Sequence, residues 1–212
     1  MRVLRSSSYH EFRPEIRCGD LVFFAGDSAL SKVIRLVTGD PTHVAIAQRL
    51  KEAESDVLDR VWLIESTTLN RWAQTRGVQS HLLSEKLKNE SEQVTVWVAR
   101  LSDAVRRRMN QELWADYLKQ MKGKRYDYIQ AVGSALGQLL PLLPSISLKT
   151  SLYCSELAAG CLRVSGAIPS NWDPTPTPWQ MAVWDIYSEV VHIQGPPRVF
   201  PSVKVFLPEH WY

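Results

Sequence analysis

The sequence has no long apolar run, no secretory signal and little net charge. Its most apolar stretch, residues 128–143, is shorter than a membrane span and contains Pro141, so no integral membrane segment is expected. The N-terminus lacks the unbroken apolar core of a signal peptide, which predicts a cytoplasmic protein and leaves export by a route without a signal open. The 25 basic and 22 acidic side chains leave a net charge of only +3, which does not indicate nucleic-acid binding.

Metal and nucleotide motifs are also missing. Three cysteines in 212 residues are too few for a disulfide scaffold. No Cys–His spacing is typical of a zinc site, and no glycine-rich loop is typical of a nucleotide site. We therefore expect neither a metal nor any other cofactor.

The composition is that of a globular chain with a substantial core, at 45% hydrophobic and 22% charged residues. Apolar runs predict strands at 21–25, 43–47, 61–64 and 94–100, with a charged loop between the second and third. Ser102 is placed to cap a helix that runs to about Lys122 before Gly123. Thr177-Pro178 is typical of another helix start. Further helices are expected at 28–37, from Asp127 to Pro141, and from about Ser151 to Val164.

Cys154 lies in the expected first turn of the helix that starts near Ser151. Unpaired backbone N–H groups and the helix dipole favour an anion at that position, so the pKa of the thiol should be lowered. The same N–H groups can stabilise an oxyanion on a substrate carbonyl. Cys154 is therefore a candidate nucleophile, with simple burial in the core as the alternative.

The other two cysteines fit that chemistry less well. Cys161 follows Cys154 by two helical turns, ~10 Å of rise, which is too far for a disulfide within one helix. Its neighbours are Ala, Gly and Leu, which favours core packing. Cys18 precedes a strand and has no helix N-terminus to activate it.

A cysteine nucleophile needs a base, and the base needs an orienting partner. His43 opens a predicted strand, whereas His81 is expected in a polar turn. If residues 43–47 pair antiparallel with 61–65 around the charged loop, the natural register joins 43 to 65, 45 to 63 and 47 to 61. His43 and Glu65 then share one face, ~5 Å apart at Cβ, and Glu65 can accept the imidazole N–H.

Five segments resemble one known family when taken in order. They are GDLVFF at 19–24, THVAI at 42–46, LIES at 63–66, GKRYDY at 123–128 and YCSEL at 153–157. The pattern resembles the circularly permuted branch of the NlpC-like papain-fold enzymes, the YiiX-type group, over roughly residues 17–185. In unpermuted relatives the cysteine helix precedes the histidine strand, and here the order is reversed.

The resemblance implies an α+β, papain-like fold in which a small antiparallel sheet or barrel packs on the cysteine helix. It implies a single domain over 1–212, with a core at about 17–185 and C-terminal strands at about 186–212. It also implies Cys154 as nucleophile, His43 as base and Glu65 as third polar residue. Tyr126 matches a position near the thiol, and Asp127 either holds a substrate ammonium group or caps the following helix.

Tyr153 and Ser155 flank the nucleophile, and their backbone groups are better candidates for a role in substrate binding than their side chains. The sequence thus predicts a cysteine hydrolase that cleaves an amide bond in a small or cell-wall-derived peptide. One alternative is a lipid acyl hydrolase or acyltransferase that uses the same thiol, with residues 128–143 along the acyl chain. The other is a non-catalytic module that binds a peptide or a lipid.

Overall fold

The computed structural model describes residues 3–26, 29–50, 60–70, 75–124 and 154–201, and all structural statements concern these ranges. They form a seven-stranded sheet in the order β1-β7-β6-β2-β3-β4-β5. Neighbouring strands are antiparallel except β1 and β7, which are parallel. The strands are β1 (Val3–Ser6), β2 (Leu21–Ala25), β3 (His43–Leu50), β4 (Arg60–Asn70), β5 (Thr75–Leu82), β6 (Thr95–Leu101) and β7 (Tyr187–Gln194).

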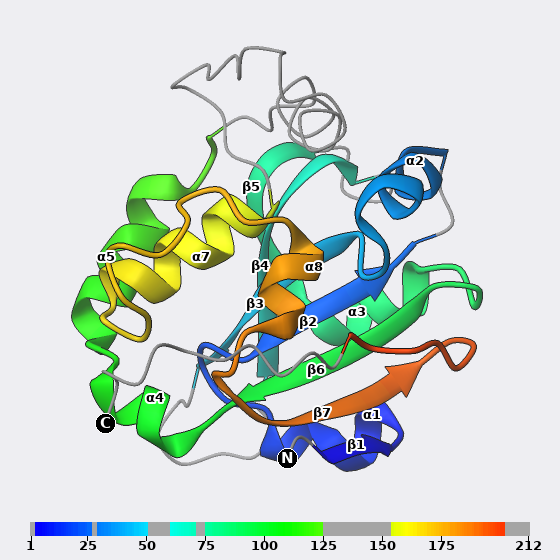
Figure 1. Ribbon diagram of the computed structural model, residues 1–212, viewed down its shortest axis with the longest axis horizontal. Helices are drawn as coiled ribbons and strands as arrows, with labels where there is room; N and C mark the ends of the chain where they lie inside the picture. Colours follow the sequence, from blue (N-terminus) through cyan, green and yellow to red (C-terminus); the bar gives the residue numbers. More distant parts are fainter. Residues whose placement is uncertain (1–2, 27–28, 51–59, 71–74, 125–153, 202–212) are drawn as a thin grey trace.

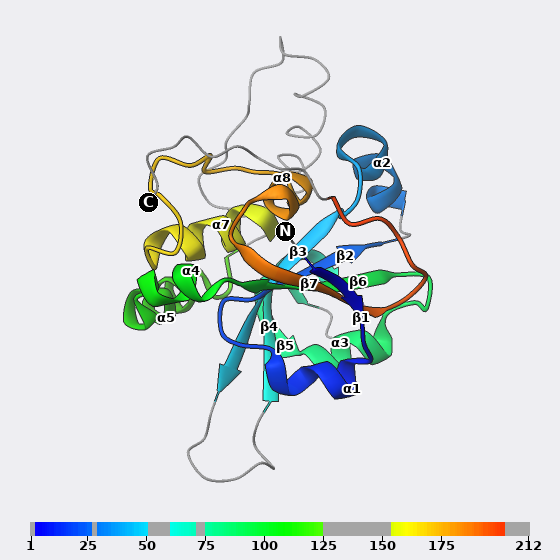
Figure 2. The same cartoon turned by 60° about the horizontal axis from the view of Figure 1, so that its bottom comes forward.

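Helices cover both faces of this sheet. They are α1 (Tyr9–Phe12) with the 3₁₀ turn η1 (Arg13–Glu15), α2 (Ala29–Thr38), α3 (Leu83–Asn89), α4 (Asp103–Arg108), α5 (Gln111–Met121), α7 (Cys154–Val164) and α8 (Pro178–Val183). Figures 1 and 2 show α7 and α8 on one side of the sheet and α1 and α3 on the other. The predicted α+β class is confirmed, with a larger sheet than expected and one parallel pair within it.

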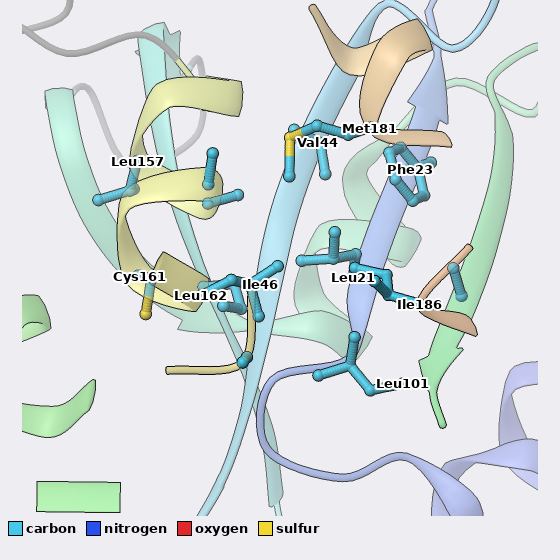
Figure 3. Packing of buried hydrophobic residues seen from close by; sticks show 14 of the residues in the cluster. Leu21, Phe23, Val44, Ile46, Leu101, Leu157, Cys161, Leu162, Met181 and Ile186 are labelled. Carbon is cyan, nitrogen blue, oxygen red and sulfur yellow. The ribbon is translucent and has the colours of Figure 1, made fainter. Parts of the chain in front are cut away.

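Strand β2 shows how the sheet divides the core into two layers. Its residues are buried without exception, and period-two alternation sends successive side chains to opposite faces. Leu21 and Phe23 join the cluster beneath α7, which Figure 3 shows together with residues of β3. Val22 and Phe24 join a second cluster with residues of α1 and α3. Burial on both faces explains why the run Leu-Val-Phe-Phe-Ala is apolar throughout.

The expected register between β3 and β4 is wrong by two residues. Ala47 pairs with Leu63, not with residue 61, and Ile46 pairs with Ile64. Strand β3 continues beyond the expected run to Leu50, whereas β4 begins only one residue earlier than expected, at Arg60, so the centre of the connection moves along the chain. A shift of two residues keeps every side chain on its predicted face, because alternation along a strand has a period of two. His43 and Glu65 therefore remain on one face as diagonal neighbours.

The helix predicted from Ser102 to Lys122 is two helices. Ser102 caps α4, since its side chain accepts from the N–H of Val105, as predicted. The first helix nevertheless ends at Arg108, and the side chain of Asn110 accepts from the first amides of α5. Asparagine competes for backbone groups in this way, which the spacing of apolar residues does not reveal. The predicted start at Thr177-Pro178 is confirmed as a capping box with Gln180.

Several predictions concern segments outside the described residues. These are the helix from Asp127 to Pro141, the apolar stretch 128–143, and strand structure in residues 202–212. The C-terminal strand that is described, β7, lies inside the sheet between β1 and β6. Among the described helices, none has both the length and the apolar character that crossing a membrane requires.

Candidate active site

His43 is the first residue of β3, and the turn before it is fixed by charged side chains. The carboxylate of Asp40 accepts from Arg35 Nε at 2.8 Å and from Arg198 Nη1 at 3.1 Å. His43 then pairs with Phe24 of β2, and the two rings lie 5.6 Å apart between centroids. This anchoring holds the imidazole at one end of the central strand pair with its side chain 22% exposed.

Glu65 lies on β4 and is fully buried. Its Oε2 is 2.6 Å from Nε2 of His43. A carboxylate in this position orients the ring and stabilises its protonated form. Because Nε2 faces Glu65, Nδ1 is the ring nitrogen left for the thiol.

Cys154 is the first residue of the described part of α7, and only 5% of it is exposed. The groups that act on its sulfur are His43 and the backbone amides of Val44 and Ser155. Burial by itself would raise the pKa of the thiol, but the charge of His43 and hydrogen bonds from these groups lower it below its usual value. The thiolate is thus favoured by donors from two elements, β3 and α7.

The same pairing acts on the imidazole. Burial would lower the pKa of His43, whereas the negative charges of Cys154 and Glu65 raise it to about 10. Both pKa shifts favour the proton on His43 and the negative charge on Cys154. An imidazolium beside a thiolate, with a carboxylate on the other ring nitrogen, is the arrangement that activates cysteine nucleophiles in general.

The residues of this site come from opposite sides of the sheet. Alternation places His43 and Glu65 on the face that packs against α1 and α3, together with Ala45 and Leu63. Helix α7 covers the other face, and its Cys154 meets the imidazole where β3 begins. The site thus lies at the end of a strand, where a side chain from one layer can reach the other.

Two residues beside Glu65 were missed by the sequence analysis. The second oxygen, Oε1, lies 3.1 Å from Nζ of Lys86 and 3.2 Å from Nε2 of His81. His81 was expected in a polar turn, but it lies on β5 and is 5% exposed. A signal for Lys86 was present, because it shares one face of α3 with Leu83 and Leu87 at helical spacing. A lysine that is buried in such a position needs a charged partner.

The remaining cysteines lie in packed surroundings. Cys161 is fully buried on α7, and burial raises the pKa of its thiol well above the usual value. Cys18 is half-buried, and its sulfur is 3.2 Å from both the N and the O of Arg49. Core packing was the preferred interpretation of Cys161, and the structure confirms its burial. Within the described ranges, no imidazole acts on either thiol as His43 acts on Cys154.

Ser155 is the one predicted substrate-binding residue that the structure describes. It is fully buried, and its backbone amide bonds to the sulfur of Cys154. Tyr126, Asp127 and Tyr153 lie outside the described residues. Across the described ranges, no group of three or more His, Cys, Asp or Glu side chains is arranged to hold a metal ion.

Several solved structures match this chain. No protein-family model matches the chain, and no curated protein matches it. The crystal structure of the metalloprotein YiiX from Escherichia coli O157:H7 is similar at a TM-score of 0.48 and 18% identity. The match covers 85% of this chain and 89% of that one. A functional proposal therefore rests on the geometry of this chain's own residues.

Proposed function

We propose that this protein is a cysteine-dependent hydrolase that cleaves an amide bond. The observation that carries the proposal is the position of His43 between Cys154, whose pKa it lowers, and Glu65, whose Oε2 lies 2.6 Å from its Nε2. An unused buried cysteine needs no imidazole beside it, and an imidazole that holds its proton at neutral pH has one to give to a leaving group. The substrate class we expect is a small or cell-wall-derived peptide.

The first half of the reaction forms a thioester. The Cys154 thiolate attacks the carbonyl carbon, and backbone amides beside the sulfur, such as those of the first turn of α7, stabilise the oxyanion. As the C–N bond breaks, His43 gives its proton to the leaving nitrogen. Glu65 holds the ring in position during this transfer.

The second half releases the acid. His43, now neutral, takes a proton from water, and the resulting hydroxide attacks the thioester carbonyl. The C–S bond breaks, the carboxylic acid leaves, and the thiolate–imidazolium pair is restored. Every proton in this cycle moves between His43, the substrate and water.

We further propose that the chain is one papain-like domain in permuted order. The chain order supports this, since His43 and Glu65 on the sheet precede Cys154 on its helix. The packing of α7 on β3 and β4 is also what a cysteine helix on a sheet requires.

The test is amine release from a panel of small peptides and cell-wall fragments, measured by mass spectrometry with purified protein. We expect turnover in the wild type and a loss of at least about 10³-fold in Cys154→Ala and His43→Ala. Cys161→Ala is the matched control, because it removes a buried thiol from the same helix without touching the imidazole. Full turnover in Cys154→Ala would overturn the mechanism.

Phospholipids and fatty-acyl esters belong in the same panel. An acyl adduct on Cys154 from these donors, without peptide cleavage, would replace the amidase proposal with the lipid chemistry. Residues 128–143, on which the lipid alternative was based, lie outside the described residues. Tight binding of a panel compound without any adduct or product would indicate the non-catalytic module.

A further inference from the structure

The carboxylate of Glu65 has two oxygens, and the proposed mechanism uses only one of them. Oε2 binds His43, while Oε1 is 3.1 Å from the ammonium group of Lys86. Glu65 is fully buried, and 11% of the Lys86 side chain is exposed. The orienting carboxylate is thus held between an imidazole from β3 and a cation from α3.

The charges of this cluster balance only when Lys86 is counted. The Cys154 thiolate and the Glu65 carboxylate are negative, and the His43 imidazolium and Lys86 are positive. Without Lys86 the buried set carries one excess negative charge, which is costly away from water. A buried carboxylate in that situation takes up a proton and no longer holds an imidazolium.

The direction of the pKa shifts agrees with this balance. Burial would raise the pKa of Glu65, but the charge of Lys86 and then that of His43 hold it well below its usual value. Burial would likewise lower the pKa of Lys86, and the charges of Glu65 and Glu90 raise it. Both groups therefore stay ionised together.

Other groups facing this pair complete the cluster. His81 of β5 lies 3.2 Å from the same oxygen, and Glu90 of α3 lies 2.9 Å from the ammonium. The ring of Phe24 packs between the two cationic groups, 5.4 Å from Nζ of Lys86 and 5.6 Å from the ring of His43. Because 29% of the Glu90 side chain is exposed, water screens its charge more than that of Glu65.

We infer that Lys86 is a positioning residue of the active site: it keeps Glu65 ionised, so that His43 stays oriented and charged beside Cys154. This inference rests on the proposed function. Lys86 acts through Glu65 and does not touch the sulfur in this role. The position of Lys86 beside Glu65 explains how an ionised carboxylate, and not a neutral amide, can be the fully buried partner of His43.

The experiment measures iodoacetamide alkylation of Cys154 against pH, resolved by site with mass spectrometry. A thiolate that persists below pH 8 gives the profile an acidic limb, the range in which the labelling rate rises with pH. In Lys86→Met we expect this acidic limb to move to higher pH by about one unit or more, so that labelling at about pH 6 slows about tenfold. Lys88→Met is the matched control, since it removes an exposed charge from the same helix. The charge-conserving variant Lys86→Arg should retain most of the limb.

A second background makes the test independent of folding defects. In Glu65→Gln the third residue carries no charge, so adding Lys86→Met should cause no further shift. The double variant should also fold even if Lys86→Met alone does not, because no lone carboxylate is buried. An additional shift of similar size in that background would show that Lys86 does not act through Glu65, and the inference would fail.

The outcomes separate this inference from the proposed function. An acidic limb that is present in the wild type and unmoved in Lys86→Met overturns the role of Lys86 and leaves the hydrolase proposal standing. A wild type without an acidic limb overturns the hydrolase proposal. In that case the carboxyl carbon of Glu65, followed by ¹³C NMR against pH, still decides whether Lys86 holds it ionised. An unchanged Glu65 titration in Lys86→Met would then overturn the role of Lys86 as well.

Discussion

Asp20, just before β2, and Glu65, on β4, are both fully buried carboxylates, and their pKa values move in opposite directions. Asp20 precedes β2, where its oxygens accept from the amides of Arg17 at 2.7 Å and Leu101 at 2.9 Å and pair with Arg106. Burial raises the pKa of Asp20 to about 6, and the charge of Arg106 offsets only part of this effect. At Glu65 the cations prevail, and its pKa lies well below the usual range.

The difference between the two regions lies in the placement of their cations. Glu65 faces Lys86 on one oxygen and His43 on the other, so the ionised form is favoured from both sides. Among the described residues, Asp20 pairs with Arg106 and is acted on more weakly by Arg100, and its oxygens otherwise accept from backbone amides. Asp20 therefore joins the ends of β2, β6 and α4, whereas the surroundings of Glu65 maintain a charge. Burial alone does not indicate which task a carboxylate has.

Removal of either side chain should have the largest effect on stability. Asp20→Ala and Glu65→Ala each leave a cation without its anion, and we expect a loss of about 4 kcal/mol in the free energy of unfolding. Urea titration of both variants at neutral pH measures this. A loss below about 1 kcal/mol at either site would mean that water enters the space left by the carboxylate and solvates the remaining cation.

The pH dependence of stability should have opposite signs at the two sites. The native pKa of Asp20 lies above its ordinary value of 3.8, so its contribution is complete below that value and is lost as pH rises to about 6, by about 3 kcal/mol. The native pKa of Glu65 is lowered, so its contribution is present above its ordinary value of 4.5 and is lost as pH falls. The stability difference between wild type and Asp20→Asn, and between wild type and Glu65→Gln, isolates each slope. Slopes of the same sign would contradict the comparison.

At neutral pH, replacing each carboxylate by its amide should change the free energy of unfolding by less than replacing it by alanine, and by different amounts at the two sites. Glu65→Gln should cost about 2 kcal/mol of stability and lower kcat/KM about tenfold or more, because the ionised form is the one this site favours. Asp20→Asn should cost less, about 1 kcal/mol, and leave kcat/KM unchanged, because burial favours a neutral group there and the amide oxygen, unlike alanine, can still accept hydrogen bonds. Chemical denaturation and amine-release assays on the folded variants test both statements.

The smallest effect is expected where an ion pair is open to water. Arg17 and Asp103 lie 3.6 Å apart, with 56% and 77% of their side chains exposed. Asp103→Asn should change the free energy of unfolding by less than about 0.5 kcal/mol. The same urea titration provides the measurement, and a change as large as that at Asp20 would show that burial is not what distinguishes these pairs.

Local features of the fold were largely predictable from the sequence. The buried run of β2 and the caps at Ser102 and Thr177 involve residues within a few positions of each other, so short-range chemistry decides them. The break at Asn110 is also local, but periodicity concealed it because Met109 and Leu113 continue the apolar pattern. The prediction failed there because a cap competed with helix propensity.

The candidate site was predictable in part. Period-two alternation put His43 and Glu65 on one face, and that result survived an error of two residues in register. His81 was misplaced because β5 is rich in polar residues and resembles a turn. Lys86 was passed over because a lysine between two leucines on a short helix is usually solvated at its end.

By itself, then, the sequence determined which residues alternate, which cap helices and which share a face, since those properties depend on neighbours along the chain. Only the tertiary structure decided that Cys154 from α7 meets His43 at the start of β3, and that Lys86 from α3 meets the far oxygen of Glu65. The physical reason is that a local pattern specifies the face a side chain occupies but not its partner there. Contacts between distant segments, and the charge states they produce, depend on how the layers pack.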